Sequence, residues 1–235
     1  MRRNNKDCFK FKEVFRPAGV IFDMDGVLFD SEKTFVSTYE EAGKHFGYNI
    51  TRDFVLSLLG MSGEELHAVV LEHFGNDFPY EQIRDYRRLL YRKELEKNGV
   101  PKKPGLDYLL DHLAAAKIPI ALATAKSKEM ASFCLSNAGI LDRFTAIICS
   151  NEVKNGKPAP DIFFLAAERL GQPPSACVGF EDSVAGLKGL SAAGIRSIFI
   201  KDLVEPPKEI LATVWQRCND LSEAVILFGL AEKSL

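Results

Sequence analysis

The sequence has none of the features that mark a membrane-spanning, secreted or nucleic-acid-binding protein. No apolar stretch approaches the roughly 20 residues that cross a bilayer, and a formal net charge of −2 is not the basic surplus typical of nucleic-acid binding. The five cysteines are scattered and contain no CxxC pair, which argues against a disulfide framework or a zinc site. Without P-loop or dinucleotide fingerprints, a kinase or a dehydrogenase is unsupported. These absences predict a cytoplasmic protein that binds neither membranes nor nucleic acid.

The composition is that of an ordinary soluble globular protein. Hydrophobic residues make up 46% of the 235 residues and charged residues 26%. This length suits one domain with an insertion, or two small domains. Residues 1–16 are basic but lack a hydrophobic segment and a cleavage site, so they predict an N-terminal extension rather than a secretory signal. Nothing in the sequence demands a second subunit, and we expect a monomer.

The most informative feature is a pair of carboxylates that directly follows a short apolar run. Asp23 and Asp25 flank Met24, and Gly26 comes next, immediately after Val20-Ile21-Phe22. Two like charges at the end of a buried strand repel each other and lose hydration. A divalent cation removes both problems because hard oxygen ligands suit Mg²⁺. The pattern therefore predicts a metal-assisted active site near the N-terminus.

Beyond this motif the sequence divides into a helical block and an alternating block. Residues 32–102 show helical periodicity and no clear strand, with breaks at Gly47 and Asn98-Gly99. From residue 106 onward, helical segments alternate with short apolar strands, as in a parallel sheet covered on both faces. The predicted helices are 106–116, 128–138, 161–170 and 184–193, and the strands that follow them are 118–122, 146–149, 176–180 and 197–200.

This pattern predicts an α/β fold: a Rossmann-like parallel sheet with helices on both faces and an inserted all-helical cap. The core domain comprises residues 1–31 and 103–235, and the cap comprises residues 32–102. In open α/β sheets, ligands bind beyond the carboxyl ends of the strands. Polar side chains follow several of these ends, and we expect them on one rim with the aspartate pair: Thr124, Lys157, Glu181 and Asp182.

Four blocks of sequence resemble the haloacid dehalogenase-like phosphohydrolases, in the branch with a small helical cap near β-phosphoglucomutase. They occur in the family's order and spacing between residues 20 and 200, and their joint match is far more specific than the first block alone. The blocks are Asp23-Met24-Asp25-Gly26-Val27-Leu28-Phe29-Asp30-Ser31, Ala123-Thr124-Ala125, Gly156-Lys157-Pro158-Ala159-Pro160-Asp161-Ile162-Phe163 and Gly179-Phe180-Glu181-Asp182-Ser183-Val184-Ala185-Gly186.

The resemblance implies a phosphatase that works through an aspartyl-phosphate intermediate. Asp23 would be the nucleophile and Asp25 the general acid and base. Thr124 and the amide of Ala125 would hold phosphate oxygens, and Lys157 would neutralise charge in the transition state.

The resemblance also implies a Mg²⁺ site and a small phosphorylated metabolite as the substrate. Asp23, the Asp25 carbonyl and Asp182 would ligate the metal, with Glu181 in or beside that shell. The cap loop would contact the substrate through Gly60, Met61 and Glu64. Its neutral, partly apolar character suggests a modest organic phosphate such as a sugar phosphate.

Each of these residues also has a simpler structural interpretation. Thr124 before a helix could be only an N-cap, and a lone lysine before proline is normally a solvated loop charge. Glu181-Asp182 at a helix start could merely complement the helix dipole. Four such coincidences on one rim are much less probable than one site.

The cap departs from the mutase pattern. Phe35 stands where β-phosphoglucomutase has a histidine, and Leu59 and Gly63 stand where its cap loop carries a lysine and an arginine. A mutase must hold a second phosphate, which favours such cations. A phosphomonoesterase is therefore the preferred interpretation, with a sugar phosphomutase as the alternative.

Three further interpretations have less support. Dehalogenase chemistry would leave Asp25 and Glu181-Asp182 without a role, and no cap lysine stands out for the Schiff base of a phosphonatase. A catalytically silent binding or regulatory module would be expected to lack the nucleophile or a metal ligand, and neither is missing.

Overall fold

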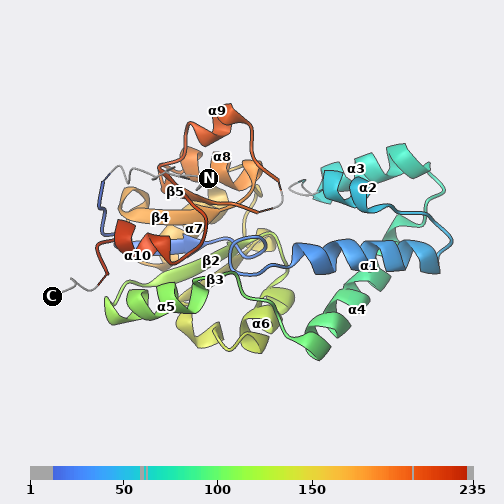
Figure 1. Cartoon of the computed structure of the whole chain (residues 1–235). Coiled ribbons are helices and arrows are strands. Elements are labelled where there is room, and N and C mark those ends of the chain that lie inside the picture. Colours follow the sequence, from blue (N-terminus) through green and yellow to red (C-terminus); the bar gives the residue numbers. More distant parts are fainter. Residues whose placement is uncertain (1–12, 59–60, 62, 203, 232–235) are drawn as a thin grey trace, which may run out of the picture.

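Six parallel strands form one sheet in the order β3-β2-β1-β4-β5-β6 in the computed structural model of the chain (Figure 1). The structure describes residues 13–58, 61, 63–202 and 204–231. Strand β1 lies at the centre of the sheet, with β2 and β4 as its neighbours, so the carboxyl ends of these three strands meet at one edge. The strands are β1 (Gly19–Phe22), β2 (Ile120–Thr124), β3 (Ala146–Cys149), β4 (Cys177–Glu181), β5 (Arg196–Ile200) and β6 (Gln216–Cys218).

Helices cover both faces of the sheet because its central strands are apolar on both sides. In β1, Val20 and Phe22 belong to one buried cluster and Ile21 to another, as the two-residue period of a strand requires. Helices α5 (Leu106–Ala115), α6 (Lys128–Asn137) and α10 (Glu223–Leu227) contribute to the first cluster, and α7 (Asp161–Arg169) contributes to the second. Helix α8 (Val184–Ala192) packs beside α7, and α9 (Lys208–Leu211) follows β5.

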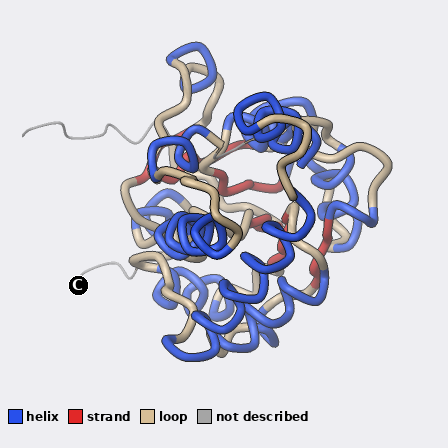
Figure 2. Tube along the Cα trace, turned by 90° about the vertical axis from the view of Figure 1, so that its right-hand side faces the viewer, coloured by secondary structure: helices blue, strands red, loops and turns tan. Residues whose placement is uncertain are grey.

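The chain between β1 and α5 forms four helices at the carboxyl ends of the strands. Figure 1 shows this cap to one side of the sheet, and Figure 2 views the molecule from the cap side. The cap has its own apolar core, in which Val36 and Tyr39 of one helix meet Ile83 of another. Its helices are α1 (Glu32–His45), α2 (Arg52–Ser57), α3 (Gly63–Phe74) and α4 (Tyr80–Asn98).

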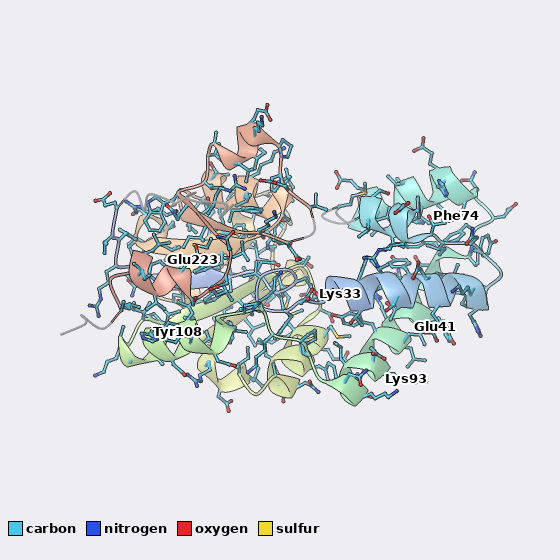
Figure 3. All side chains as sticks on the ribbon, viewed as in Figure 1. Lys33, Glu41, Phe74, Lys93, Tyr108 and Glu223 are labelled. Carbon is cyan, nitrogen blue, oxygen red and sulfur yellow. The ribbon has the colours of Figure 1, made fainter. Side chains whose placement is uncertain are left out.

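The two linkers between core and cap are hydrogen-bonded to each other. The Asp30 N–H donates to the Pro101 carbonyl at 2.9 Å, and the Lys103 N–H donates to the Leu28 carbonyl at 2.9 Å. This pairing fixes the place where the cap leaves and rejoins the core. Lys33, labelled in Figure 3, marks the start of α1 just beyond the outgoing linker.

The predicted fold class is confirmed, and the boundaries differ in detail. Strand β2 is predicted two residues too early, because Pro119 lacks the N–H that a ladder requires and the sheet begins after it. Strand β6 and helices α9 and α10 are not predicted at all. The sequence Gln-Arg-Cys of β6 has neither length nor apolar character to identify it. Within the described residues no helix is long and apolar enough to cross a membrane.

Part of the predicted N-terminal extension packs on the core. The Phe15 N–H donates to the Leu227 carbonyl at 2.9 Å. Its ring meets Trp215 edge-on at 6.0 Å, and the Arg196 guanidinium lies 4.0 Å from its centroid. Residues 1–12 of the extension lie outside the described residues.

We expect Phe180→Ala to lower the free energy of unfolding by about 3–5 kcal/mol, because the change leaves a large cavity in the core. Phe180 is fully buried and stacks on Phe22 with ring centroids 4.9 Å apart. Urea denaturation measures the loss. Phe164→Ala is the matched control. Because Phe164 is 45% exposed, this substitution should lower the free energy of unfolding by less than about 1 kcal/mol. Equal losses in the two variants would contradict the assigned core.

Candidate active site

The carboxyl ends of four strands surround a single cavity of about 500 Å³. Strand β1 places Asp23 and Asp25 there, β2 places Thr124, and the loop from β4 to α8 places Asp182. Lys157 reaches the same cavity from the loop between β3 and α7. The structure therefore gathers on one rim the polar residues that the sequence places at separate strand ends.

A buried ion triad forms the floor of this cavity. The Lys157 Nζ lies 2.5 Å from Asp23 Oδ1 and 2.5 Å from Glu181 Oε1. The exposed fraction of the side chain is 12% for Asp23, 10% for Lys157 and zero for Glu181. Lys157 is therefore a structural counter-ion for two carboxylates, and the interpretation as a solvated loop charge is wrong.

Burial and charge act on this triad in opposite directions. Burial raises the pKa of Asp23 to about 7, and the nearby charges of Glu181 and Asp25 raise it as well, while Lys157 opposes the shift. Burial by itself would lower the pKa of Lys157, but the attraction of Asp23 and Glu181 outweighs it and raises that pKa. Lys157 is therefore a permanent cation. Any further positive charge near Asp23 would stabilise the charged form of its carboxylate.

Glu181 is satisfied on both oxygens. While Oε1 accepts from Lys157, Oε2 accepts from the N–H groups of Asp182 and Ser183 at 3.0 and 2.9 Å, and from the Ser183 hydroxyl at 2.9 Å. A side chain on Gly186 would collide with this carboxylate, which explains the glycine in the first turn of α8. Glu181 thus positions Lys157 and the turn into α8, and its predicted place in or beside a metal shell stays a prediction.

Two residues contact the Asp25 carboxylate, one through a hydrogen bond and one through an ion pair. The Ser31 hydroxyl, just before α1, donates to Asp25 Oδ1 at 2.6 Å. Lys126, two residues beyond Thr124, places its Nζ 3.3 Å from Asp25 Oδ2 and 5.1 Å from the centre of the Tyr91 ring. Asp25 is the more open of the two aspartates, with 35% of its side chain exposed. Its carboxylate is therefore accessible from the cavity.

Thr124 is not the cap of the following helix. Its Oγ1 accepts from the Lys126 N–H at 3.1 Å, whereas Ser127 caps α6 by accepting from the Met130 N–H at 3.3 Å. Thr124 is buried and lines the cavity together with Ala125. The turn after β2 therefore offers a hydroxyl and backbone groups to a ligand, and the N-cap interpretation is wrong.

The donor set fits a divalent cation. Asp23, Asp25 and Asp182 line one cavity, and Glu181 shares the Lys157 ammonium with Asp23, so oxygen ligands are gathered at this end of the sheet. Gly26 has a φ of +75°, and a Cβ there would collide with the Asp182 carboxylate, so the glycine makes room for Asp182. Two carboxylates, a backbone carbonyl and water are donors that Mg²⁺ accepts.

The described part of the chain holds no ready-made cluster of three or more histidine, cysteine, aspartate or glutamate side chains around one metal position. The ion triad explains this, because Asp23 and Glu181 both turn an oxygen to Lys157. The residues that could hold the cation are therefore Asp23 through its second oxygen, Asp182 and the Asp25 carbonyl.

Among the predicted cap contacts, Met61 lines the cavity. Gly60 lies outside the described residues, as does the side chain of Glu64. The sequence-based reasoning missed the roles of Ser31, Lys126 and Tyr91. Ser31 is the last residue of the first sequence block and Lys126 directly follows Ala125, so both could have been considered from the sequence, whereas nothing in the sequence marks Tyr91.

Comparisons with known proteins agree with this geometry. A family model described as haloacid dehalogenase-like hydrolase matches residues 20–200. A probable pseudouridine-5'-phosphatase of Drosophila melanogaster is 32% identical over 188 residues, which is 77% of this chain and 80% of the relative. A β-phosphoglucomutase of Bacillus subtilis is 31% identical over 186 residues, which is 76% of this chain and 81% of the relative.

The fold is also similar to that of a solved structure. CbbY from Rhodobacter sphaeroides, in complex with phosphate, superimposes with a TM-score of 0.78 at 25% identity, covering 88% of this chain and 96% of that one. The family match spans all four sequence blocks and every polar residue of the cavity floor. The chain therefore belongs to the haloacid dehalogenase-like hydrolase family.

Proposed function

We propose that the protein hydrolyses a small organic phosphomonoester in a Mg²⁺-dependent reaction with Asp23 as the nucleophile. The observation that carries this proposal is the placement of two unlike carboxylates on one cavity. Asp23 is buried against Lys157, and Asp25 is half-exposed and held by Ser31. Such a difference in environment is how two aspartates acquire different roles.

In the first step, an Asp23 oxygen attacks the phosphorus of the substrate and the bond from phosphorus to the alcohol oxygen breaks. Lys157, already 2.5 Å from Asp23, offsets negative charge on the nucleophile and on the phosphoryl group in transit. The Thr124 hydroxyl and the Ala125 amide bind the phosphoryl oxygens on the side of β2. A bound Mg²⁺ would supply further charge neutralisation and hold the phosphoryl group in line with Asp23.

Asp25 moves the protons in both halves of the reaction. Its carboxyl group first donates a proton to the departing alkoxide, and the resulting carboxylate then takes a proton from a water molecule. That water attacks the phosphorus, the bond between phosphorus and Asp23 breaks, and inorganic phosphate leaves. Such acid–base assistance typically contributes about 10²–10⁴-fold to the rate.

The same residues argue against the other interpretations. A dehalogenase has no use for Asp25 held over the cavity, and a silent module would not need the buried ion triad. Phe35 faces the cavity as an apolar ring where a mutase would have its histidine, which favours transfer to water. The relatives include both phosphatases and a mutase, so product analysis decides between the two.

Asp23→Asn should abolish release of inorganic phosphate from a panel of phosphomonoesters, because the amide is not a nucleophile. Asp25→Asn should lower kcat by about 10²–10⁴-fold. The exposed Asp142→Asn serves as the control and should keep full activity. Near-normal turnover by Asp23→Asn would rule out the assigned nucleophile. A second assay offers β-glucose 1-phosphate together with glucose 1,6-bisphosphate. If glucose 6-phosphate is the dominant product, the protein is a phosphomutase instead.

Mg²⁺ should raise the thermal unfolding temperature, and more strongly at pH 8 than at pH 6. Without metal the pKa of Asp23 is about 7, so at pH 6 a proton competes with the cation for this carboxylate, and at pH 8 it does not. Differential scanning fluorimetry with and without Mg²⁺ measures the shift. Asp182→Asn should reduce it at both pH values. An equal shift at pH 6 and pH 8, or an unchanged shift in Asp182→Asn, would contradict the proposed ligands.

A further inference from the structure

The cavity in front of Asp23 has two walls of opposite character. The core supplies a polar wall of carboxylates, ammonium groups and hydroxyls, which is the machinery of the proposed phosphatase function. The cap supplies the facing wall from helices α1, α3 and α4 and from Leu58 and Met61, which follow α2. The cap residues that line it are Phe35, Leu58, Met61, Leu66 and Tyr91.

The described side chains of the cap wall offer few hydrogen-bonding groups. Within the described part of the cap, no charged side chain lines the cavity, and the phenol of Tyr91 is the only polar side-chain group on that wall. Burial raises the pKa of Tyr91, so the phenol stays neutral, and its hydroxyl interacts with Ser31. A ligand that reaches past the phosphate therefore meets an apolar surface.

The two rings of this wall are held in place by neighbouring cations. The Phe35 ring packs edge-on against Tyr39 at 5.0 Å, and the buried guanidinium of Arg87 lies 4.7 Å from its centre. On the other side, Lys126 lies 5.1 Å from the centre of the Tyr91 ring. These contacts fix both rings before a ligand arrives. Tyr91 is buried, with 3% of its surface exposed, so the ring that a ligand can pack against is Phe35, and a fixed aromatic surface favours flat apolar partners.

We propose that the alcohol portion of the substrate carries a planar ring, such as a heterocyclic base, which packs against Phe35 and the apolar side chains around it. This inference rests on the phosphatase function proposed above and narrows its substrate. A bare sugar phosphate would press several hydroxyls against a wall on which Tyr91 is the one polar side chain among the described cap residues, and most of these hydroxyls would lose water without compensation. The cavity volume of about 500 Å³ lies within the range of clefts that enclose ligands of this size.

A matched pair of substrates tests the inference. Uridine 5'-monophosphate and ribose 5-phosphate present the same primary phosphate ester and differ by the base. A second pair, 2-phenylethyl phosphate and glycerol 3-phosphate, contrasts a plain ring with hydroxyl groups. With Mg²⁺ present, we expect kcat/KM to be about tenfold or more higher for the ring-bearing ester in at least one pair. The inference is overturned if neither ring-bearing ester exceeds its partner.

Substitutions in the cap wall should change this preference. Met61→Gln places an amide on the wall, and the ratio of kcat/KM between ring-bearing and ring-free esters should fall severalfold. Phe35→Leu keeps the wall apolar but removes a ring, and should lower the same ratio. Leu89→Gln is the control, because Leu89 is 47% exposed on the same cap and lies outside the cavity lining. Ratios unaffected by both wall substitutions would contradict the assigned packing surface.

Binding to the Asp23→Asn variant separates failure of this inference from failure of the proposed function. Calorimetry should give tighter binding of uridine 5'-monophosphate than of ribose 5-phosphate, whether or not turnover occurs. Hydrolysis of both esters with no preference, and equal binding, would overturn the ring-bearing substrate and leave the phosphatase intact. Absence of hydrolysis of every phosphomonoester by the unmodified protein would overturn the proposed function itself.

Discussion

One buried ammonium group organises the active site. Lys157 lies between Asp23 at the end of β1 and Glu181 at the end of β4, with both contacts at 2.5 Å. Removing one member of a buried charge group leaves its partners uncompensated, at a cost of about 3–5 kcal/mol. Because Glu181 also accepts two backbone N–H groups at the turn into α8, the triad ties together the central strands, the Lys157 loop and that turn. The geometry around the proposed nucleophile, Asp23, is thus built into the core.

The second aspartate depends instead on the boundary between core and cap. Asp25 receives a hydrogen bond from Ser31, the residue before α1, and an ion pair from Lys126, whose ammonium also meets the Tyr91 ring of the cap. The paired linkers hold this boundary together next to Asp25. The core therefore holds the buried charges, and the described cap residues line the facing side of the cavity.

Much of the fold and of the candidate site could be predicted from the sequence, because the sequence patterns that mark them are local. The apolar run before Asp23 gives β1 its observed bounds, and the alternating segments give the parallel sheet. Strand β6 could not be found, since three residues pair only because β5 is already in place. The burial of Arg87 could not be predicted either. In the sequence Arg87 is one of many charged residues on a polar helix. In the structure its guanidinium is buried over Phe35 and Tyr39, because α1 and α4 pack together.

The central claim is that Asp23 forms a covalent bond to phosphorus, and it can be tested by trapping that bond. Acid quenching during turnover, followed by peptide mass spectrometry, would locate the phosphoryl group. The account predicts a phosphorylated peptide containing Asp23 in the unmodified protein, at higher occupancy in Asp25→Asn, where attack by water is slowed, and none in Asp23→Asn. A phosphoryl group on another residue, or steady turnover in both proteins with no phosphorylated peptide, would contradict the account.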